Sequence, residues 1–107
     1  MKKIVLLCAA GMSTSLLVNR MREAARAEGL DCTIDAFPTS QAAIHGKDAD
    51  VVLIGPQVKF ELRKVQGMLS CPVEVIDMLS YGTLNGRKVL DQAKKLMEEN
   101  NGTHGAD

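Results

Sequence analysis

Aromatic side chains are scarce in this chain, which has one tyrosine, two phenylalanines and no tryptophan among its 107 residues. Proteins that bind single-stranded nucleic acid stack bases on such side chains, and nucleic-acid binders in general carry a basic excess. Here lysine and arginine number 13, aspartate and glutamate also number 13, and the formal net charge is zero. The composition therefore argues against nucleic acid as a partner.

Cysteine spacing and hydrophobic runs exclude further classes. The chain has three cysteines, Cys8, Cys32 and Cys71, without C-x-x-C spacing, which argues against a disulfide scaffold and a zinc site. No apolar run approaches the roughly 20 residues that span a bilayer. The start at Met1-Lys2-Lys3 resembles a signal peptide, but the apolar part is short and runs directly into a structured motif. We therefore expect a cytoplasmic protein.

Strand-like and helix-like segments alternate along the chain, and we expect one domain over residues 3–99. Strands are predicted at residues 3–8, 32–37, 50–54 and 73–76. Helices are predicted at 13–28, where Gly29 ends the helix, at 41–44, from Pro56 to about residue 69, and at 87–99. A loop is expected over 77–86, and Asn100-Asn101-Gly102 is expected to end the last helix, with a frayed tail over 100–107.

This alternation of strands and helices predicts an α/β fold, a four-stranded parallel sheet with helices on both faces. Right-handed crossovers place the carboxyl ends of all four strands at one edge, where such sheets bind ligands. The loops at this edge begin at Cys8, Phe37, Gly55 and Asp77. Because every apolar face can be buried in one such sandwich, we expect a monomer.

The segment that begins at Cys8 has the composition of an anion site. Cys8 ends an apolar strand and is followed by Ala9, Ala10, Gly11, Met12, Ser13, Thr14 and Ser15, where a helix begins. The amides and partial positive charge of a helix N-terminus can hold a dianion and activate a thiol. Gly11 permits a tight turn, and the three hydroxyls add donors. The pattern favours a cysteine that carries a phosphoryl group over a cysteine that is merely buried beside a helix cap.

Cysteine-based phosphatases have a similar loop, but with an arginine six residues after the cysteine that clamps the phosphate. Here that position is Thr14. A phosphocysteine without this cation, and without a clear acid–base partner for water, is expected to wait for a specific acceptor. This indicates a relay. Two alternatives stay open, namely a phosphatase-like or arsenate-reductase-like enzyme and a non-catalytic anion-binding module.

Residues 8–18 read Cys-Ala-Ala-Gly-Met-Ser-Thr-Ser-Leu-Leu-Val. This segment closely resembles the phosphocysteine loop of the IIB components of the bacterial phosphoenolpyruvate-dependent sugar phosphotransferase system, lactose/cellobiose class. The likeness continues through Asp35-Ala36-Phe37-Pro38, residues 49–57, residues 72–77 and Tyr81-Gly82, and covers about residues 3–97. It implies a fold of the low-molecular-weight tyrosine phosphatase type, which agrees with the sheet predicted above.

The resemblance implies that Cys8 is the nucleophile and that Ala9 to Ser15 cradle the phosphate. A IIA protein would donate from a phosphohistidine, and phospho-Cys8 would then phosphorylate a sugar, expected to be a β-linked disaccharide, bound by the IIC permease at the inner face of the membrane. No metal or cofactor is implied. Gln57 and Tyr81 are candidates for contacts with the loop or with partners. His45 is interpreted as a surface histidine.

Overall fold

Four parallel strands form the centre of the molecule in the order β2-β1-β3-β4. The computed structural model describes residues 1–9 and 14–106. The strands are β1 (Lys2–Cys8), β2 (Cys32–Pro38), β3 (Val51–Ile54) and β4 (Val73–Val75), and every pairing is parallel. Each lies within about two residues of its predicted range. The predicted four-stranded parallel sheet is confirmed.

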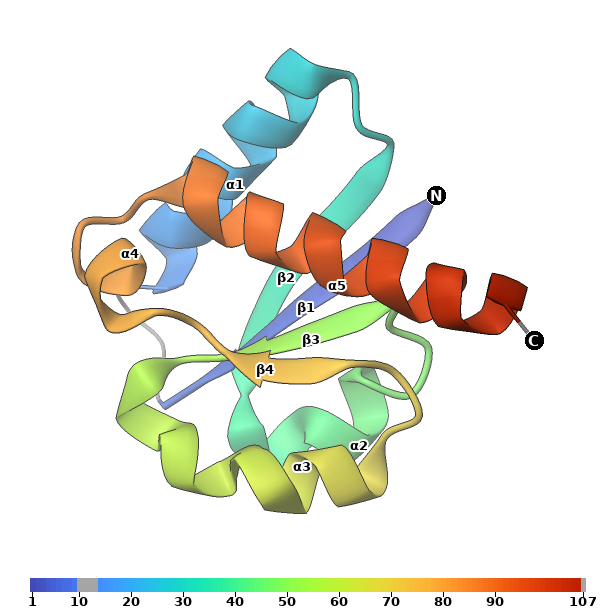
Figure 1. Cartoon of the computed structure of the whole chain (residues 1–107). Helices are drawn as coiled ribbons and strands as arrows, with labels where there is room; N and C mark the ends of the chain where they lie inside the picture. The colour runs from blue at the N-terminus through green and yellow to red at the C-terminus, as the bar shows by residue number, and fades with distance from the viewer. Residues whose placement is uncertain (10–13, 107) are drawn as a thin grey trace.

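Helices cover both faces of this sheet (Figure 1). On one face, α1 (Thr14–Glu28) and α5 (Gly86–Ala106) pack on Ile4, Leu6 and Cys8 of β1. On the other face, α2 (Ala42–His45) and α3 (Leu62–Met68) pack on Val5 and Leu7. Because alternate residues of a strand point to opposite faces, both sets are buried and β1 is apolar from Ile4 to Cys8.

Helix α1 shows how local signals decide an element. Leu17, Met21 and Ala25 recur every fourth residue and are buried. Gly29 follows the helix with a φ of +71°, a conformation that favours glycine. Its N–H bonds the Arg26 carbonyl at 3.1 Å, and the next N–H bonds the Ala25 carbonyl at 2.9 Å. The predicted helix end at Gly29 is confirmed.

The chain turns into short helices after β2 and β3. After β2, the 3₁₀ helix η1 (Thr39–Gln41) leads into α2, close to the short helix predicted there. After β3, the single helix expected from Pro56 is instead the 3₁₀ helix η2 (Pro56–Glu61) followed by α3. The regular path is interrupted at Val58, with φ −121° and ψ 29°. The Val58 side chain is buried among the residues of the α2 and α3 face, so packing takes precedence over a regular helix.

The loop expected over residues 77–86 was wrong, because it contains the helix α4 (Met78–Gly82). Asp77 caps this helix, since its carboxylate accepts hydrogen bonds from the Ser80 N–H at 2.9 Å and hydroxyl at 3.1 Å. The helix ends at Gly82, and Leu84 beyond its cap at Thr83 has a φ of +54°. A glycine normally marks such an end, and its absence hid this helix from sequence analysis.

Helix α5 is longer than expected. Asn85 caps its start, since the Asn85 side-chain oxygen accepts from the Lys88 N–H at 3.1 Å. The helix continues to Ala106, so the end predicted at Asn100 was wrong, whereas the frayed tail over residues 100–107 stays a prediction. Asn and Gly cost a helix at most about 1 kcal/mol each, which does not by itself end a long helix. Residue 107 lies outside the described residues, and the domain boundary at residue 99 stays a prediction.

Candidate functional site

Cys8 lies at the carboxyl end of β1. At this point of the sheet, the segments that follow two neighbouring strands lead to opposite faces. The segment after β1 leads to α1 on one face, and the segment after the neighbouring β3 leads to η2 and α3 on the other (Figure 1). Parallel sheets bind ligands in the crevice at such a switch point. The predicted position of Cys8 at the functional edge therefore corresponds to the strand order that the structure adopts.

The Cys8 side chain is 2% exposed and lines a small pocket of about 140 Å³. Its walls are Thr14 and Ser15 from the first turn of α1, together with Ala36, Phe37 and Pro38 from the end of β2. The first turn of a helix has backbone N–H groups without intrahelical partners, which favour an anion. The pocket thus places a sulfur beside a helix N-terminus, in a space suited to a small group.

Larger hollows lie elsewhere but have less suitable chemistry. A groove of about 410 Å³ between α1 and β2 contains Cys32. Burial, and secondly the negative charge of Asp31, raise the pKa of the Cys32 thiol, which disfavours its reactive thiolate. A second hollow of about 580 Å³ lies beside α5 and mixes acidic and basic side chains. We therefore take the chemistry around Cys8, and not the volume of a hollow, as the indicator of the site.

Gly55 makes room for the Cys8 sulfur. A Cβ atom at position 55 would lie 3.1 Å from the Cys8 Sγ and 3.2 Å from the Gln57 Oε1. Gly55 has φ −62° and ψ 145°, values that any residue can adopt, so it is the space and not the backbone that requires glycine. The same distances place the amide end of Gln57, an exposed residue, on the side of Gly55 that faces the sulfur.

Tyr81 contacts the first turn of α1 from within the core. Its hydroxyl lies 3.3 Å from the Thr14 Oγ1, and the two residues are 7% and 1% exposed. The contact joins α4 to the helix start that borders Cys8. The two candidates for contacts with the loop or with partners thus differ. Gln57 is exposed, whereas Tyr81 lies beneath the start of α1.

The predicted phosphate cradle is described in part. Ala9 is exposed, Thr14 is buried and Ser15 is exposed beside the pocket. Ala10, Gly11, Met12 and Ser13 lie outside the described residues. The structure thus brings together Cys8, Thr14 and Ser15, and the role of the whole segment from Ala9 to Ser15 stays a prediction.

Two residues have partners that sequence analysis missed. Asp77, at the same edge as Cys8, uses its carboxylate to cap α4, and the hydrogen bonds from Ser80 lower its pKa. The spacing Asp-x-x-Ser before a helix is a recognisable cap and could have shown this. The His45 ring stacks on Phe37, with ring centres 3.5 Å apart, and its Nε2 lies 3.0 Å from the Gln41 Oε1. His45 is half-buried and not simply a surface histidine.

Neither a metal site nor a membrane span emerges from the residues that the structure describes. Over residues 1–9 and 14–106, no three histidine, cysteine, aspartate or glutamate side chains gather as metal ligands would. Among the same residues, no helix has the length and apolar character needed to cross a bilayer.

Comparison with known proteins gives a consistent result. The family model described as "PTS system, Lactose/Cellobiose specific IIB subunit" matches residues 3–92. The oligo-β-mannoside-specific EIIB component of Bacillus subtilis is 47% identical over 100 residues, which cover 91% of this chain and 97% of that protein. The galactose-specific EIIB component of Lactococcus lactis is 44% identical over 104 residues, or 90% of this chain and 96% of that protein.

A solved structure agrees. The solution structure of the cellobiose-specific phosphotransferase IIB component from Borrelia burgdorferi superposes with a TM-score of 0.77 at 34% identity. The match covers 92% of this chain and 93% of that one. The expected fold of the low-molecular-weight tyrosine phosphatase type is confirmed, because these IIB domains have it.

Proposed function

This chain belongs to the lactose/cellobiose-specific IIB family of the sugar phosphotransferase system, and we propose that Cys8 is the residue that carries the phosphoryl group. Members of this family are phosphotransferases that work with IIA and IIC subunits. The observation that carries the proposal is the position of the Cys8 sulfur, in a small pocket between the first turn of α1 and the end of β2. No other described cysteine lies at the carboxyl edge of the sheet.

The transfer consists of two displacements at phosphorus. In the first, the Cys8 thiolate attacks a phosphohistidine of a IIA protein, so that the S–P bond forms and the P–N bond breaks. In the second, a hydroxyl of a sugar bound by the IIC permease attacks, so that the O–P bond forms and the S–P bond breaks. The hydroxyl proton passes to water or to the departing sulfur, and free Cys8 is restored. The partial positive charge at the start of α1 stabilises the negative charge on the phosphoryl oxygens in both steps.

Two features around the pocket support a relay over a phosphatase. Thr14 stands where cysteine-based phosphatases have their arginine, and its side chain is buried against Tyr81. Asp77, which follows β4 at this edge, accepts two hydrogen bonds from Ser80 with its carboxylate, so it is poorly placed to activate water. The phosphocysteine is thereby protected from hydrolysis until an acceptor docks.

The surroundings of the pocket support docking of protein partners. Leu16 in the first turn of α1, Phe60 in η2, and Met78 and Leu79 in α4 are large apolar residues between 47% and 77% exposed. All four belong to elements that follow carboxyl ends of strands, the edge at which Cys8 lies. We propose that the IIA and IIC partners use this surface in turn, at the cytoplasmic side of the membrane.

The names of the relatives support a sugar choice made outside this chain. Proteins 34% to 47% identical to it are named for oligo-β-mannosides, for galactose and for cellobiose. The pocket of about 140 Å³ is sized for a phosphoryl group and has little room for a disaccharide. We therefore propose a β-linked disaccharide as the acceptor, selected by the IIC permease.

Mass spectrometry after phosphorylation tests the proposal. The protein is incubated with phosphoenolpyruvate, the general phosphotransferase proteins and a IIA protein, and the intact mass is then measured. We expect the gain of one phosphoryl group, located on Cys8 by peptide mapping and absent in Cys8→Ser. The matched control Cys32→Ser, at the opposite end of the sheet, should load as the wild type does. Loading of Cys8→Ser would place the acceptor elsewhere.

A second assay separates a carrier from a phosphatase. p-Nitrophenyl phosphate is offered to the unmodified protein without IIA. A carrier leaves it intact, whereas turnover that depends on Cys8 would favour the phosphatase alternative. Failure to load in the first assay together with no turnover in the second would favour the non-catalytic anion-binding module.

A further inference from the structure

The two outer strands of the sheet are β2 and β4. At the start of β2, the Asp31 carbonyl accepts a hydrogen bond from the Lys2 N–H of β1 at 3.1 Å. The backbone groups of residue 31 and of the odd-numbered residues after it therefore point toward β1. Cys32, Ile34 and Ala36 consequently direct their N–H and C=O groups away from the sheet. Such a row of backbone groups can pair with a strand of another molecule.

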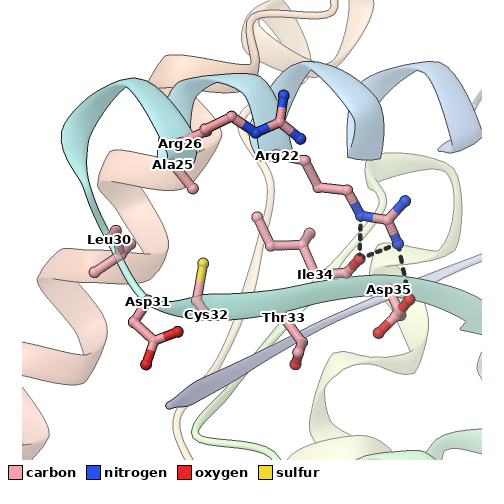
Figure 2. A pocket seen from close by; sticks show the side chains of 9 residues that line it. All are labelled: Arg22, Ala25, Arg26, Leu30, Asp31, Cys32, Thr33, Ile34 and Asp35. Carbon is pink, nitrogen blue, oxygen red and sulfur yellow. Dashed lines mark hydrogen bonds and ion pairs between the residues drawn. The ribbon is translucent and has the colours of Figure 1, made fainter.

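Arg22 of α1 occupies this edge (Figure 2). Its Nε and Nη2 donate to the Ile34 carbonyl at 3.0 and 2.6 Å, and Nη2 also contacts the Asp35 Oδ1 at 2.9 Å. Two donors of one guanidinium thus share the central outward carbonyl of β2. The ion pair with Asp35 fixes the guanidinium in the path that an incoming strand would follow.

The opposite edge is occupied in the same way. In β4, the Val52 N–H bonds the Pro72 carbonyl at 3.0 Å, so the backbone carbonyl of residue 72 points toward β3. The backbone N–H and C=O groups of Val73 and Val75 therefore point away from the sheet. Gln66 of α3 donates its Nε2 to the Val73 carbonyl at 3.1 Å. Gln92 of α5 donates its Nε2 to the Val75 carbonyl at 3.0 Å.

We propose that Arg22, Gln66 and Gln92 close both edges of the sheet to strand addition by a second copy of this chain. The three side chains come from three different helices, yet each bonds a carbonyl that points outward from an edge strand. An added strand needs these carbonyls as acceptors for its own N–H groups. The three side chains therefore keep the protein monomeric. The surface at the carboxyl ends of the strands, around Cys8, is left for partners.

The test removes the donors but keeps the apolar stems. Arg22→Met opens β2 alone, and two equal edges can pair once about a twofold axis, so we expect dimers and nothing larger. The triple variant Arg22→Met/Gln66→Met/Gln92→Met opens both edges, and we expect open-ended oligomers. Sedimentation velocity over a wide concentration range measures the masses. The wild type should stay monomeric, and Arg22→Lys, which can still donate to the Ile34 carbonyl, should stay monomeric as well.

The matched control is Arg26→Met. Arg26 lines the same groove of α1 and β2, but Figure 2 shows it without a bond to the strand. It should remain monomeric, which separates loss of edge closure from loss of surface charge. Amide hydrogen exchange then locates the contact, because the outward N–H groups of Ile34 and Ala36 should become protected in the dimer of Arg22→Met.

Three results would overturn the proposal. One is a folded Arg22→Met that stays monomeric at the highest concentration, the second is association of Arg26→Met to the same extent, and the third is association without protection at Ile34 and Ala36. Should Arg22→Met fail to fold, Gln66→Met/Gln92→Met makes the same test at β4, where a folded, monomeric variant would likewise refute edge closure.

Discussion

Gly55→Ala should slow phosphoryl transfer while leaving the protein almost as stable as before. The new Cβ would lie 3.1 Å from the Cys8 Sγ, a contact tighter than nine in ten real ones, so the sulfur must give by a few tenths of an ångström. Since a displacement of about 1 Å in a reacting group can cost about 100-fold in rate, we expect a decrease of roughly tenfold.

The stability terms for this change nearly cancel. Crowding of a packed site costs about 1–3 kcal/mol, and the lower end applies because the contacts are a thiol and a flexible glutamine end. Replacing glycine by alanine in a conformation that alanine can adopt returns about 0.4–1 kcal/mol. The net change is therefore about 0–1 kcal/mol, or a decrease in Tm of at most roughly 8 °C in a domain of this size.

Rapid-quench measurement of loading from phosphorylated IIA, beside thermal unfolding, tests both parts. Gly67→Ala is the control, because a Cβ at position 67 of α3 meets nothing within 4 Å. It should load at the wild-type rate and unfold at a slightly higher temperature. The reasoning fails if Gly55→Ala loads as fast as the wild type, or if it loses activity only because it is unfolded.

Three further changes test other contacts. A double-mutant cycle of Thr14→Val and Tyr81→Phe should give a coupling of about 0.5–1 kcal/mol by urea unfolding, the weak end for a hydrogen bond because 3.3 Å is long; zero coupling would refute the bond. Asp77→Ala should lower the Tm at neutral pH but not in strong acid, because the lowered pKa of Asp77 confers stability that is lost as pH falls through the folded-state value; a difference independent of pH would contradict this. Gly86→Ala should destabilise by about 1–3 kcal/mol in thermal unfolding, since its Cβ would lie 2.5 Å from the backbone carbonyl carbon of Arg20, and an unchanged Tm would refute the close approach of α1 and α5.

The elements that sequence analysis predicted correctly are those in which several local signals agree. The apolar run of β1 is long enough to be buried on both faces, and α1 combines a period of four with glycine at its end. Helix α4 lacked such agreement, because it has five residues, exposes Met78 and Leu79, and is followed after its cap by Leu84 in a positive-φ conformation where glycine is usual. Its one local signal was the cap formed by Asp77.

Contacts between distant parts of the chain left no local signal. Thr14 and Tyr81 are 67 residues apart, and neither residue type specifies the other. The same holds for Gln92 and its acceptor on β4, which are 17 residues apart. Each pair exists only after helices and strands have packed, so a periodic pattern cannot report it.

The neighbourhood of Cys8 shows where prediction from the sequence ends. The alternation of strands and helices placed Cys8 and Gly55 at one edge of a parallel sheet, and that edge is observed. Alternation does not fix the order of the strands, because right-handed crossovers are compatible with several orders. Only when β3 pairs directly with β1 does the turn after β3 reach the sulfur, and the register of Leu7 opposite Ile54 then brings Gly55 beside Cys8. The requirement for glycine at position 55 therefore follows from the pairing of β1 with β3, and it becomes a prediction about catalysis once that pairing is known.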